Sequence, residues 1–256
     1  MTREAWRGGA VPRYELEAWR ARFGVVAGVT ARATAEGDTF CLGLWTGEPV
    51  GEVMRRWRAL RGLEDGAFGL TVLGHQVHGP AVRWAEPGEG WRLVEGVDGH
   101  ATAAPGVLLT VTIADCIPVY LVDARSGALA LLHAGWRGTA AGILSRGLAL
   151  LGERAGTRAA DVHVHLGVGI SGPCYEVGRE VMDGCGVPAP GPGPWQLDLR
   201  AVLADQARAA GVAEVSTSDW CSARDRDRFF SHRASGGTDG RMVAYLGRPG
   251  TGAAFG

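Results

Sequence analysis

The 256-residue sequence contains no lysine, so its 26 basic side chains other than histidine are all arginine. Arginine suits bidentate contacts to phosphate, although a GC-rich genome explains the absence of lysine more simply. The arginines are balanced by 27 acidic residues, and a net charge near zero creates no global field that would attract nucleic acid or an anionic membrane. Any anionic ligand must therefore be held by a local cluster of charges.

The sequence also lacks the features of a membrane or exported protein. No apolar run approaches the roughly 20 residues that span a bilayer, and charges throughout the N-terminal segment argue against a signal peptide. Five cysteines stand at irregular spacing without a CxxC motif, which favours a reducing compartment over a disulfide framework. We therefore expect a cytoplasmic protein that binds neither nucleic acid nor membranes.

No internal repeat and no clear linker divide the chain. We therefore predict one compact α/β domain over residues 23–256, preceded by a lightly structured lead-in over residues 1–22. Short predicted strands alternate with a few helices without a regular strand–helix rhythm. This pattern favours mixed sheets (α+β) over a doubly wound parallel sheet.

Local patterns predict individual elements. An apolar stripe at helical spacing predicts a helix over residues 49–60. Residues 85–106 are rich in Gly and Glu and are predicted to be mainly loop. A second helix is predicted over residues 139–152, directly after the glycine-flanked turn at residues 135–138. Its positive end would then offer an anion site.

A cysteine and a histidine flank two apolar runs in the middle of the chain. The runs at residues 117–122 and 128–132 are separated by turn-forming residues and predict a β-hairpin. If the hairpin closes around Arg125, Cys116 lies opposite His133, with Cβ atoms roughly 4.5–5.5 Å apart. A thiolate and an imidazole at that distance can share a metal ion or act as nucleophile and base.

His78 offers a possible third ligand, because it follows a predicted strand over residues 68–73. One Cys and two His form a zinc set that leaves a fourth position open for water, as in catalytic sites. Such a site would bring the pKa of the bound water toward about 7. The residues alone leave open a zinc site built from His78, Cys116 and His133 and a metal-free dyad of Cys116 and His133.

Five segments, taken in order, carry the most distinctive motifs of the sequence. They are QVHG at residues 76–79, ADCIPVYLVD at 114–123, HAGWRGTAAGIL at 133–144, GPCYEVGREV at 172–181 and FFSHR at 229–233. They resemble the motifs of the family variously called laccase-domain proteins, polyphenol oxidases, purine nucleoside phosphorylases and peptidoglycan editing factors. The resemblance runs from about residue 23 to residue 246, and ADC together with HAGWRG is a highly specific pair.

The resemblance implies that His78, Cys116 and His133 bind a catalytic zinc, with copper as the alternative that the family's older name suggests. It implies mixed sheets in an α/β/β/α four-layer arrangement. It also implies a purine nucleoside and phosphate as substrates. The activities reported for the family include phosphorolysis of adenosine, inosine and methylthioadenosine, and deamination of adenosine.

Several segments away from the three metal ligands depart from the family pattern. The usual Arg-x-Gly-Gly-Val-Ser segment is replaced at residues 32–37, Asp-Ala-Leu by Asp98-Gly99-His100, and the Tyr of Phe-Ser-Tyr-Arg by His232. The usual Thr-Gly-Arg segment is altered at residues 238–241. We expect these positions to line the rim of the pocket and to affect the choice of substrate.

The two nucleoside reactions need different side chains. Phosphorolysis needs donors that hold phosphate while positive charge develops on the sugar. Arg137, beside His133, is the first candidate and joins the three metal ligands as a predicted catalytic residue. Deamination needs a carboxyl group that moves protons, and the available acids are Asp98, Asp115 and Glu176. The predicted substrate-binding residues are Arg32, Asp98, Glu176, Arg233 and Arg241.

Other functions stay open at this point. A multicopper laccase needs several copper centres ligated mostly by imidazole, which seven histidines do not furnish when two of them share one site; a single copper could still support a weak polyphenol oxidase activity. A cysteine hydrolase would use Cys116 and His133 without a metal. A role in editing cell-wall precursors, or as a binding module, would need no catalysis of nucleoside chemistry.

Overall fold

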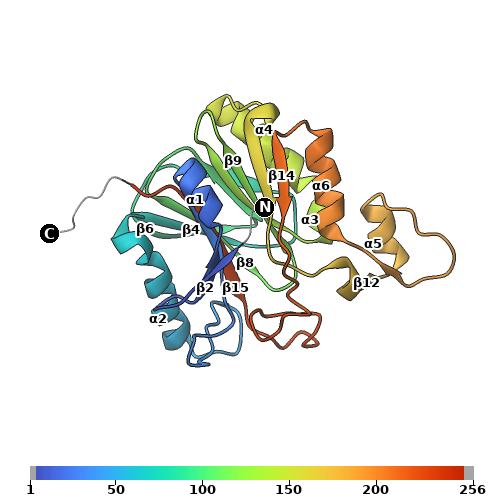
Figure 1. Cartoon of the computed structure of the whole chain (residues 1–256), viewed down its shortest axis with the longest axis horizontal. Coiled ribbons are helices and arrows are strands. Elements are labelled where there is room, and N and C mark those ends of the chain that lie inside the picture. Colours follow the sequence, from blue (N-terminus) through green and yellow to red (C-terminus); the bar gives the residue numbers. More distant parts are fainter. Residues whose placement is uncertain (1–3, 251–256) are drawn as a thin grey trace.

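Two mixed β-sheets lie face to face at the centre of the computed structural model, which describes residues 4–250 (Figure 1). The larger sheet has the strand order β1-β2-β3-β15-β8-β4-β6 and the smaller sheet β14-β11-β9-β10-β7-β5. Strand β4 is parallel to β6 and β8, and β11 is parallel to β14, whereas most other neighbours are antiparallel. The predicted single domain of mixed α/β type is confirmed.

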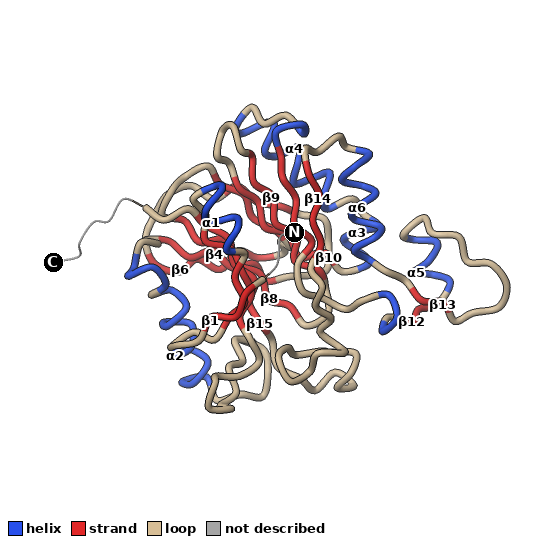
Figure 2. Tube along the Cα trace, in the orientation of Figure 1, coloured by secondary structure: helices blue, strands red, loops and turns tan. Residues whose placement is uncertain are grey.

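The strands form two sheets and a short ribbon (Figure 2). Those of the larger sheet are β1 (Ala5–Arg7), β2 (Arg13–Glu15), β3 (Val26–Thr30), β4 (Leu70–His75), β6 (Gly90–Glu95), β8 (Val107–Ile113) and β15 (Met242–Gly247). Those of the smaller sheet are β5 (Val82–Trp84), β7 (Gly99–Thr102), β9 (Ile117–Asp123), β10 (Leu129–Ala134), β11 (Val162–Leu166) and β14 (Glu214–Thr217). The ribbon pairs β12 (Glu176–Val177) with β13 (Trp195–Gln196).

Helices cover the outer faces of both sheets (Figure 1). The α-helices are α1 (Glu17–Phe23), α2 (Val50–Arg61), α3 (Trp136–Ala140), α4 (Ile143–Ala155), α5 (Arg179–Gly184) and α6 (Leu199–Ala209). Short 3-10 turns lie at Leu63–Gly66, Ala159–Asp161 and Gly172–Cys174. The predicted helix over residues 49–60 is confirmed by α2. No helix in residues 4–250 has the length and apolar character that crossing a membrane would require.

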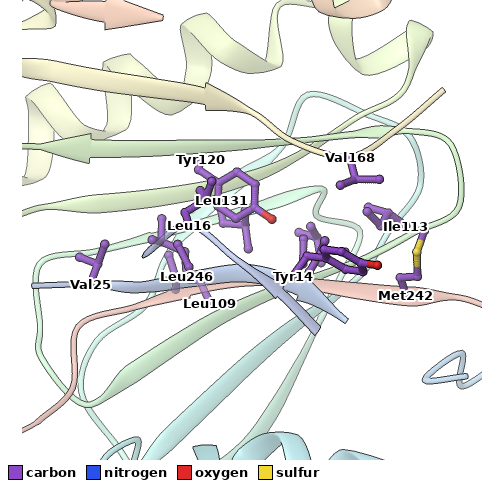
Figure 3. Packing of buried hydrophobic residues seen from close by; sticks show 14 of the residues in the cluster. Tyr14, Leu16, Val25, Leu109, Ile113, Tyr120, Leu131, Val168, Met242 and Leu246 are labelled. Atoms are coloured by element: carbon purple, nitrogen blue, oxygen red, sulfur yellow. The ribbon is translucent and has the colours of Figure 1, made fainter. Parts of the chain in front are cut away.

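The buried apolar side chains form three clusters that follow the alternation of the strands. Tyr120 and Val122 of β9 point into the cluster between the two sheets, whereas Val119 and Leu121 point into the cluster under α4 and α6. Figure 3 shows Tyr120 and Leu131 of the smaller sheet opposite Leu109 and Leu246 of the larger sheet. A third cluster joins the larger sheet to α2. These clusters fit the α/β/β/α order that the resemblance implies.

The hairpin of β9 and β10 forms, but its predicted register is wrong by two residues. His133 pairs with Pro118, not with Cys116. The reason lies in the turn, where the carboxylate of Asp123 accepts hydrogen bonds from the backbone N–H groups of Arg125 and Ser126. Gly127 follows with a φ of 75°. This local bonding makes the loop longer than a turn closing around Arg125. The shift of two keeps every side chain on its expected face.

Residues 4–22, expected to be a lightly structured lead-in, contain β1, β2 and all but the last residue of α1. Strand β2 pairs with β3 and so joins the larger sheet. Leu16 and Trp19 are buried in the cluster between the sheets. The two strands have only three residues each, too few for the alternation that identifies a strand in a sequence.

The prediction that residues 85–106 are mainly loop holds for little more than half of them, and it missed β6 and β7, which lie within this range. Strand β6 is an edge strand in which no residue is buried, and the charged Arg92 interrupts its apolar residues. Strand β7 includes Gly99, where a Cβ atom would stand 2.7 Å from the Leu132 side chain. The glycine that suggests a loop is thus required by close packing within the sheet.

The predicted helix over residues 139–152 begins earlier and is interrupted. Gly142 has a φ of 77° and separates the five-residue α3 from α4. Residues 136–140, which include most of the turn predicted at residues 135–138, therefore form a single short helical turn. Its helix dipole is correspondingly small, so an anion at this end depends mainly on side chains.

Candidate metal and substrate site

Three potential metal ligands converge where the two sheets meet. The ligand atoms of His78, Cys116 and His133 all lie within 4.8 Å of one another. His78 follows β4 of the larger sheet, and His133 belongs to β10 of the smaller sheet. Cys116 lies in the connection from β8 to β9, which crosses from one sheet to the other. The predicted grouping of these three residues thus arises from both sheets.

The space around the three side chains is kept open by Gly135. A Cβ atom at this position would stand 3.0 Å from Sγ of Cys116 and 3.1 Å from Cδ2 of His78. The φ of Gly135 is −78°, which any residue can adopt, so the requirement for glycine is purely steric. One thiolate and two imidazoles with this clearance form a donor set that suits zinc and leaves one position open.

The carboxylate of Asp98 holds two of the three potential ligands in position by hydrogen bonds. Its Oδ1 lies 2.8 Å from Nδ1 of His133 and accepts a hydrogen bond from the backbone N–H of His78 at 2.9 Å. Its Oδ2 accepts from the N–H groups of Val77 and Gly79. The side chain is fully buried. A carboxylate on Nδ1 fixes the ring orientation and leaves Nε2 of His133 available to a metal.

Two residues of the site have unusual backbone conformations. His78 has a φ of 59° and Asp115 a φ of 96°, values that cost of order 1–3 kcal/mol for a residue with a side chain. The turn at His78 is held by Asp98. Asp115 is held at both carboxylate oxygens, by Oγ of Ser222 at 2.6 Å and by the backbone N–H of Arg233 at 2.7 Å.

The electrostatics of the site favour a cation among these residues. Burial alone would raise the pKa of the Cys116 thiol, but the positive charge of His133 and hydrogen bonds from His133 and His78 lower it to about 6. Burial alone would lower the pKa of His133, but the Cys116 thiolate and Asp98 raise it to about 9. Two negative groups therefore hold a proton on His133, and a metal ion can take its place by binding the neutral imidazole.

The three ligands line a cavity of about 470 Å³ together with cationic and aromatic side chains. Among the predicted site residues, Arg137, Arg233 and Arg241 also line it. Further lining residues include Trp45, His75, Asp115, Trp136, Tyr175 and His232. The cavity thus combines a metal donor set with positive charge and aromatic walls.

The arginines of the cavity are held by different contacts. The guanidinium of Arg137 lies 4.4 Å from the ring of Trp136. That of Arg233 lies 5.0 Å from the ring of Tyr175 and donates to the Glu176 carbonyl oxygen at 2.6 Å. Arg241 donates to two backbone carbonyl oxygens of its own loop. Their charges face no carboxylate within hydrogen-bonding distance in residues 4–250, which leaves them available to an anion.

Some predicted substrate residues lie elsewhere. Arg32 pairs with Asp239 at 2.8 Å and stacks on Phe230, outside the cavity lining. Glu176 contributes its backbone carbonyl oxygen to Arg233, and its side chain is not part of the lining. Asp98 lies beneath the ligands. Of the departures from the family pattern, His232 is at the cavity, whereas His100 is buried in the core.

Sequence reasoning missed the aromatic walls of the cavity. Tyr175 lies within the GPCYEVG motif, and Trp136 within HAGWRG, so both carried a signal. Trp45 lies in the loop before α2, where nothing in the sequence pattern marks it as a cavity residue. Its ring stacks on His75 at 4.7 Å and is 60% exposed.

The sequence is similar to a family model and to several known proteins. The family model described as multi-copper polyphenol oxidoreductase laccase matches residues 26–249. The purine nucleoside phosphorylase YlmD of Geobacillus stearothermophilus is 36% identical over 250 residues, which cover 88% of this chain and 90% of YlmD. The adenosine deaminase RL5, from an unknown prokaryotic organism, is 35% identical over 167 residues, which cover 60% of this chain and 63% of RL5.

The fold is shared as well. The crystal structure of YlmD from Geobacillus stearothermophilus superimposes with a TM-score of 0.82 and 32% identity, covering 96% of this chain and 99% of that structure. The model match and the identity both extend over most of the sequence, including the segments that carry His78, Cys116 and His133. The chain therefore belongs to the multi-copper polyphenol oxidoreductase laccase family, the family that its motifs resemble.

Proposed function

We propose that this chain is a zinc-dependent purine nucleoside enzyme that acts mainly as a phosphorylase. The observation that carries the proposal is that the His78, Cys116 and His133 donor set shares one cavity with Arg137, Arg233 and Arg241. Similarity to proteins named purine nucleoside phosphorylase supports the choice of substrates. Zinc, when bound, supplies a Lewis acid at the wall of the cavity.

Phosphorolysis forms a bond between a phosphate oxygen and the anomeric carbon of the ribose and breaks the bond from that carbon to the purine nitrogen. The bond electrons leave with the base, which takes up a proton. The arginine side chains would hold the phosphate dianion in position for this displacement. Trp45, Trp136 and Tyr175 provide aromatic faces that suit a planar purine.

Deamination of adenosine is the second candidate, supported by the similarity to adenosine deaminase RL5. It requires a carboxyl group that can exchange protons with the substrate. Asp115 is the one carboxylate in the described lining of the cavity, and both of its oxygens already accept hydrogen bonds. This arrangement favours phosphorolysis as the main reaction.

Two other candidates have less support. In residues 4–250 there is one cluster of three or more ligand-type side chains, whereas a multicopper oxidase needs several copper centres. A metal-free cysteine hydrolase would use Cys116 with His133, but it does not require His78, which is hydrogen-bonded to the same thiol.

The test is incubation with adenosine, inosine or methylthioadenosine, each with and without phosphate, followed by chromatography. The proposal expects free base and a ribose phosphate only when phosphate is present, and metal analysis expects about one zinc per chain. Inosine formed from adenosine without phosphate would identify a deaminase. Absence of product with zinc bound would count against both reactions, and stoichiometric copper with phenol turnover would favour the oxidase.

Two further measurements separate the remaining alternatives. Chelation should abolish nucleoside turnover and zinc should restore it. Activity that survives chelation but is lost after thiol alkylation would instead identify a cysteine hydrolase. Turnover of neither nucleosides nor phenols would leave a role in cell-wall precursor editing.

A further inference from the structure

Two cysteines outside the metal site lie next to each other, and neither is in the described lining of the cavity. Cys174 ends the 3-10 turn at Gly172–Cys174, and Cys221 lies in the loop after β14. Cys221 is brought to this place by a β-bridge to Gly169. The thiol of Cys174 is hydrogen-bonded to that of Cys221. Both cysteines are free, and the mechanism proposed above uses neither of them.

The Cys221 sulfur is surrounded by hydrogen-bond donors. Ser171 donates its backbone N–H at 3.3 Å and its hydroxyl at 3.0 Å. Burial alone would raise the pKa of Cys221, but the bonds from Ser171 and from the backbone N–H groups of Arg224 and Ala223 lower it. Donors converging on a sulfur stabilise the thiolate, which is the reactive form of cysteine.

The partner thiol differs in accessibility. Cys221 is fully buried, whereas Cys174 is half-buried. A small oxidant in solution therefore reaches Cys174 first, although burial and the neighbouring Cys221 raise the pKa of the Cys174 thiol. Cys221 lies beside it as the second sulfur. A solvent-accessible cysteine next to a resolving cysteine is the arrangement found in thiols that oxidise reversibly.

Both cysteines are adjacent in sequence to the side chains that support Arg233. Tyr175 follows Cys174, and its ring lies 5.0 Å from the Arg233 guanidinium. Ser222 follows Cys221 and donates to Asp115, whose other oxygen accepts from the backbone N–H of Arg233. A movement of the two sulfurs would therefore affect Arg233 both through Tyr175 and through Ser222 with Asp115.

We propose that Cys174 and Cys221 form a reversible disulfide whose formation displaces Arg233 from its position at the cavity. With a peroxide as oxidant, the Cys174 thiol is oxidised to a sulfenic acid and one water is released. The Cys221 thiol loses its proton and its sulfur attacks the sulfenic sulfur, so that the S–S bond forms and the S–O bond breaks. The hydroxide that leaves takes up the proton lost from Cys221 and becomes a second water. Two thiols are thus oxidised and one peroxide is reduced to two waters.

The chemical step is tested on the full-length protein with hydrogen peroxide. Free thiols are alkylated after increasing exposure, and peptide mass spectrometry identifies linked cysteines. A peptide linking Cys174 to Cys221 should appear first and should disappear on treatment with dithiothreitol. It should be absent in Cys174→Ser and in Cys221→Ala, but retained in Cys185→Ser, a matched half-buried cysteine. Full alkylation of Cys174 and Cys221 after peroxide, or their separate overoxidation, would overturn the proposal.

The effect on Arg233 rests on the proposed function and is measured separately. Formation of the disulfide should raise the KM for phosphate roughly tenfold, the scale of one weakened hydrogen bond to a charged group. Cys174→Ser should keep its phosphate KM after peroxide. A disulfide that forms without this change would refute the coupling to Arg233. If no nucleoside is turned over even before oxidation, the proposed function fails while the disulfide result still stands, and phosphate binding is then measured by calorimetry.

Discussion

The Nδ1 atom of His133 lies 2.8 Å from a carboxylate oxygen of Asp98, and the same carboxylate binds the backbone N–H of His78. One buried side chain thus sets the ring of one metal ligand and the backbone of another. Hydrogen bonds from His133 and the backbone hold the pKa of Asp98 below its usual value, although burial alone would raise it. The carboxylate is therefore ionised wherever the site can bind a metal.

Asp98→Asn should lower zinc affinity roughly 10- to 100-fold, as loss of a carboxylate behind a ligating histidine does elsewhere. The amide cannot accept all of the bonds that the carboxylate accepts, and its NH₂ group opposes the surrounding donors. Competition with a chromogenic chelator measures the change. Glu95→Gln is the matched control, because Glu95 contacts Nδ1 of His75 outside the metal ligands. Equal zinc affinity in a folded Asp98→Asn protein would show that Asp98 does not support the metal site.

Gly135→Ala should weaken zinc binding roughly tenfold or more while leaving the fold intact. The added Cβ would meet Cys116 Sγ at 3.0 Å and His78 at 3.1 Å, and small displacements of site residues have large functional effects. Gly178→Ala is the control, because a Cβ there has no neighbour within 4 Å. Zinc titration and circular dichroism test both variants. A Gly135→Ala protein that binds zinc normally would show that the clearance is not needed.

Arg137→Gln should reduce kcat/KM for phosphate by roughly 10- to 100-fold, because it removes a charge-assisted contact to the anion. Arg32→Gln should change it less than about twofold, because the Arg32 guanidinium is already paired with Asp239 and lies outside the cavity lining. Initial rates at varied phosphate concentration give both values. The reverse order would place the phosphate site near Arg32, as the sequence alone allowed.

His100 should make the protein sensitive to mild acid. It is 1% exposed, neither ring nitrogen has a partner within residues 4–250, and burial lowers its pKa to about 4 from 6.5. The unfolded chain therefore binds a proton first as the pH falls below about 6.5. Stability is complete above that pH and declines until about pH 4, by up to about 3 kcal/mol.

His100→Leu restores the residue expected from the family pattern and should remove this decline. Denaturation at pH 7.5 and 4.5 measures the free energy of unfolding for both proteins. The loss between the two pH values should be smaller in His100→Leu than in the wild type. His163→Gln is the control, since His163 is a strand histidine paired with Glu214. An identical pH dependence in wild type and His100→Leu would assign the acid sensitivity to other groups.

The grouping of His78, Cys116 and His133 was predictable because short motifs mark these residues, whereas the residues that hold them in place were not. Asp98 was predicted to contact substrate, but its carboxylate is bound by a histidine 35 positions later in the chain. Nothing local in the sequence indicates such a pairing. The predicted register of the β9–β10 hairpin was wrong because of a local interaction. Hydrogen bonds between the Asp123 side chain and its neighbours determine the length of the turn. Helix α2 was predicted correctly since its apolar stripe is continuous.

The position of the ligands on two different sheets has a mechanical consequence. His78 directly follows a strand of the larger sheet, His133 lies in a strand of the smaller one, and Cys116 lies in the segment that crosses between them. A bound ion would link the two sheets. Metal binding should therefore raise the free energy of unfolding, because the ion binds only the folded state. Conversely, a shift of one sheet against the other would separate the three side chains without changing any of them, so a substitution in the apolar core between the sheets should weaken metal binding.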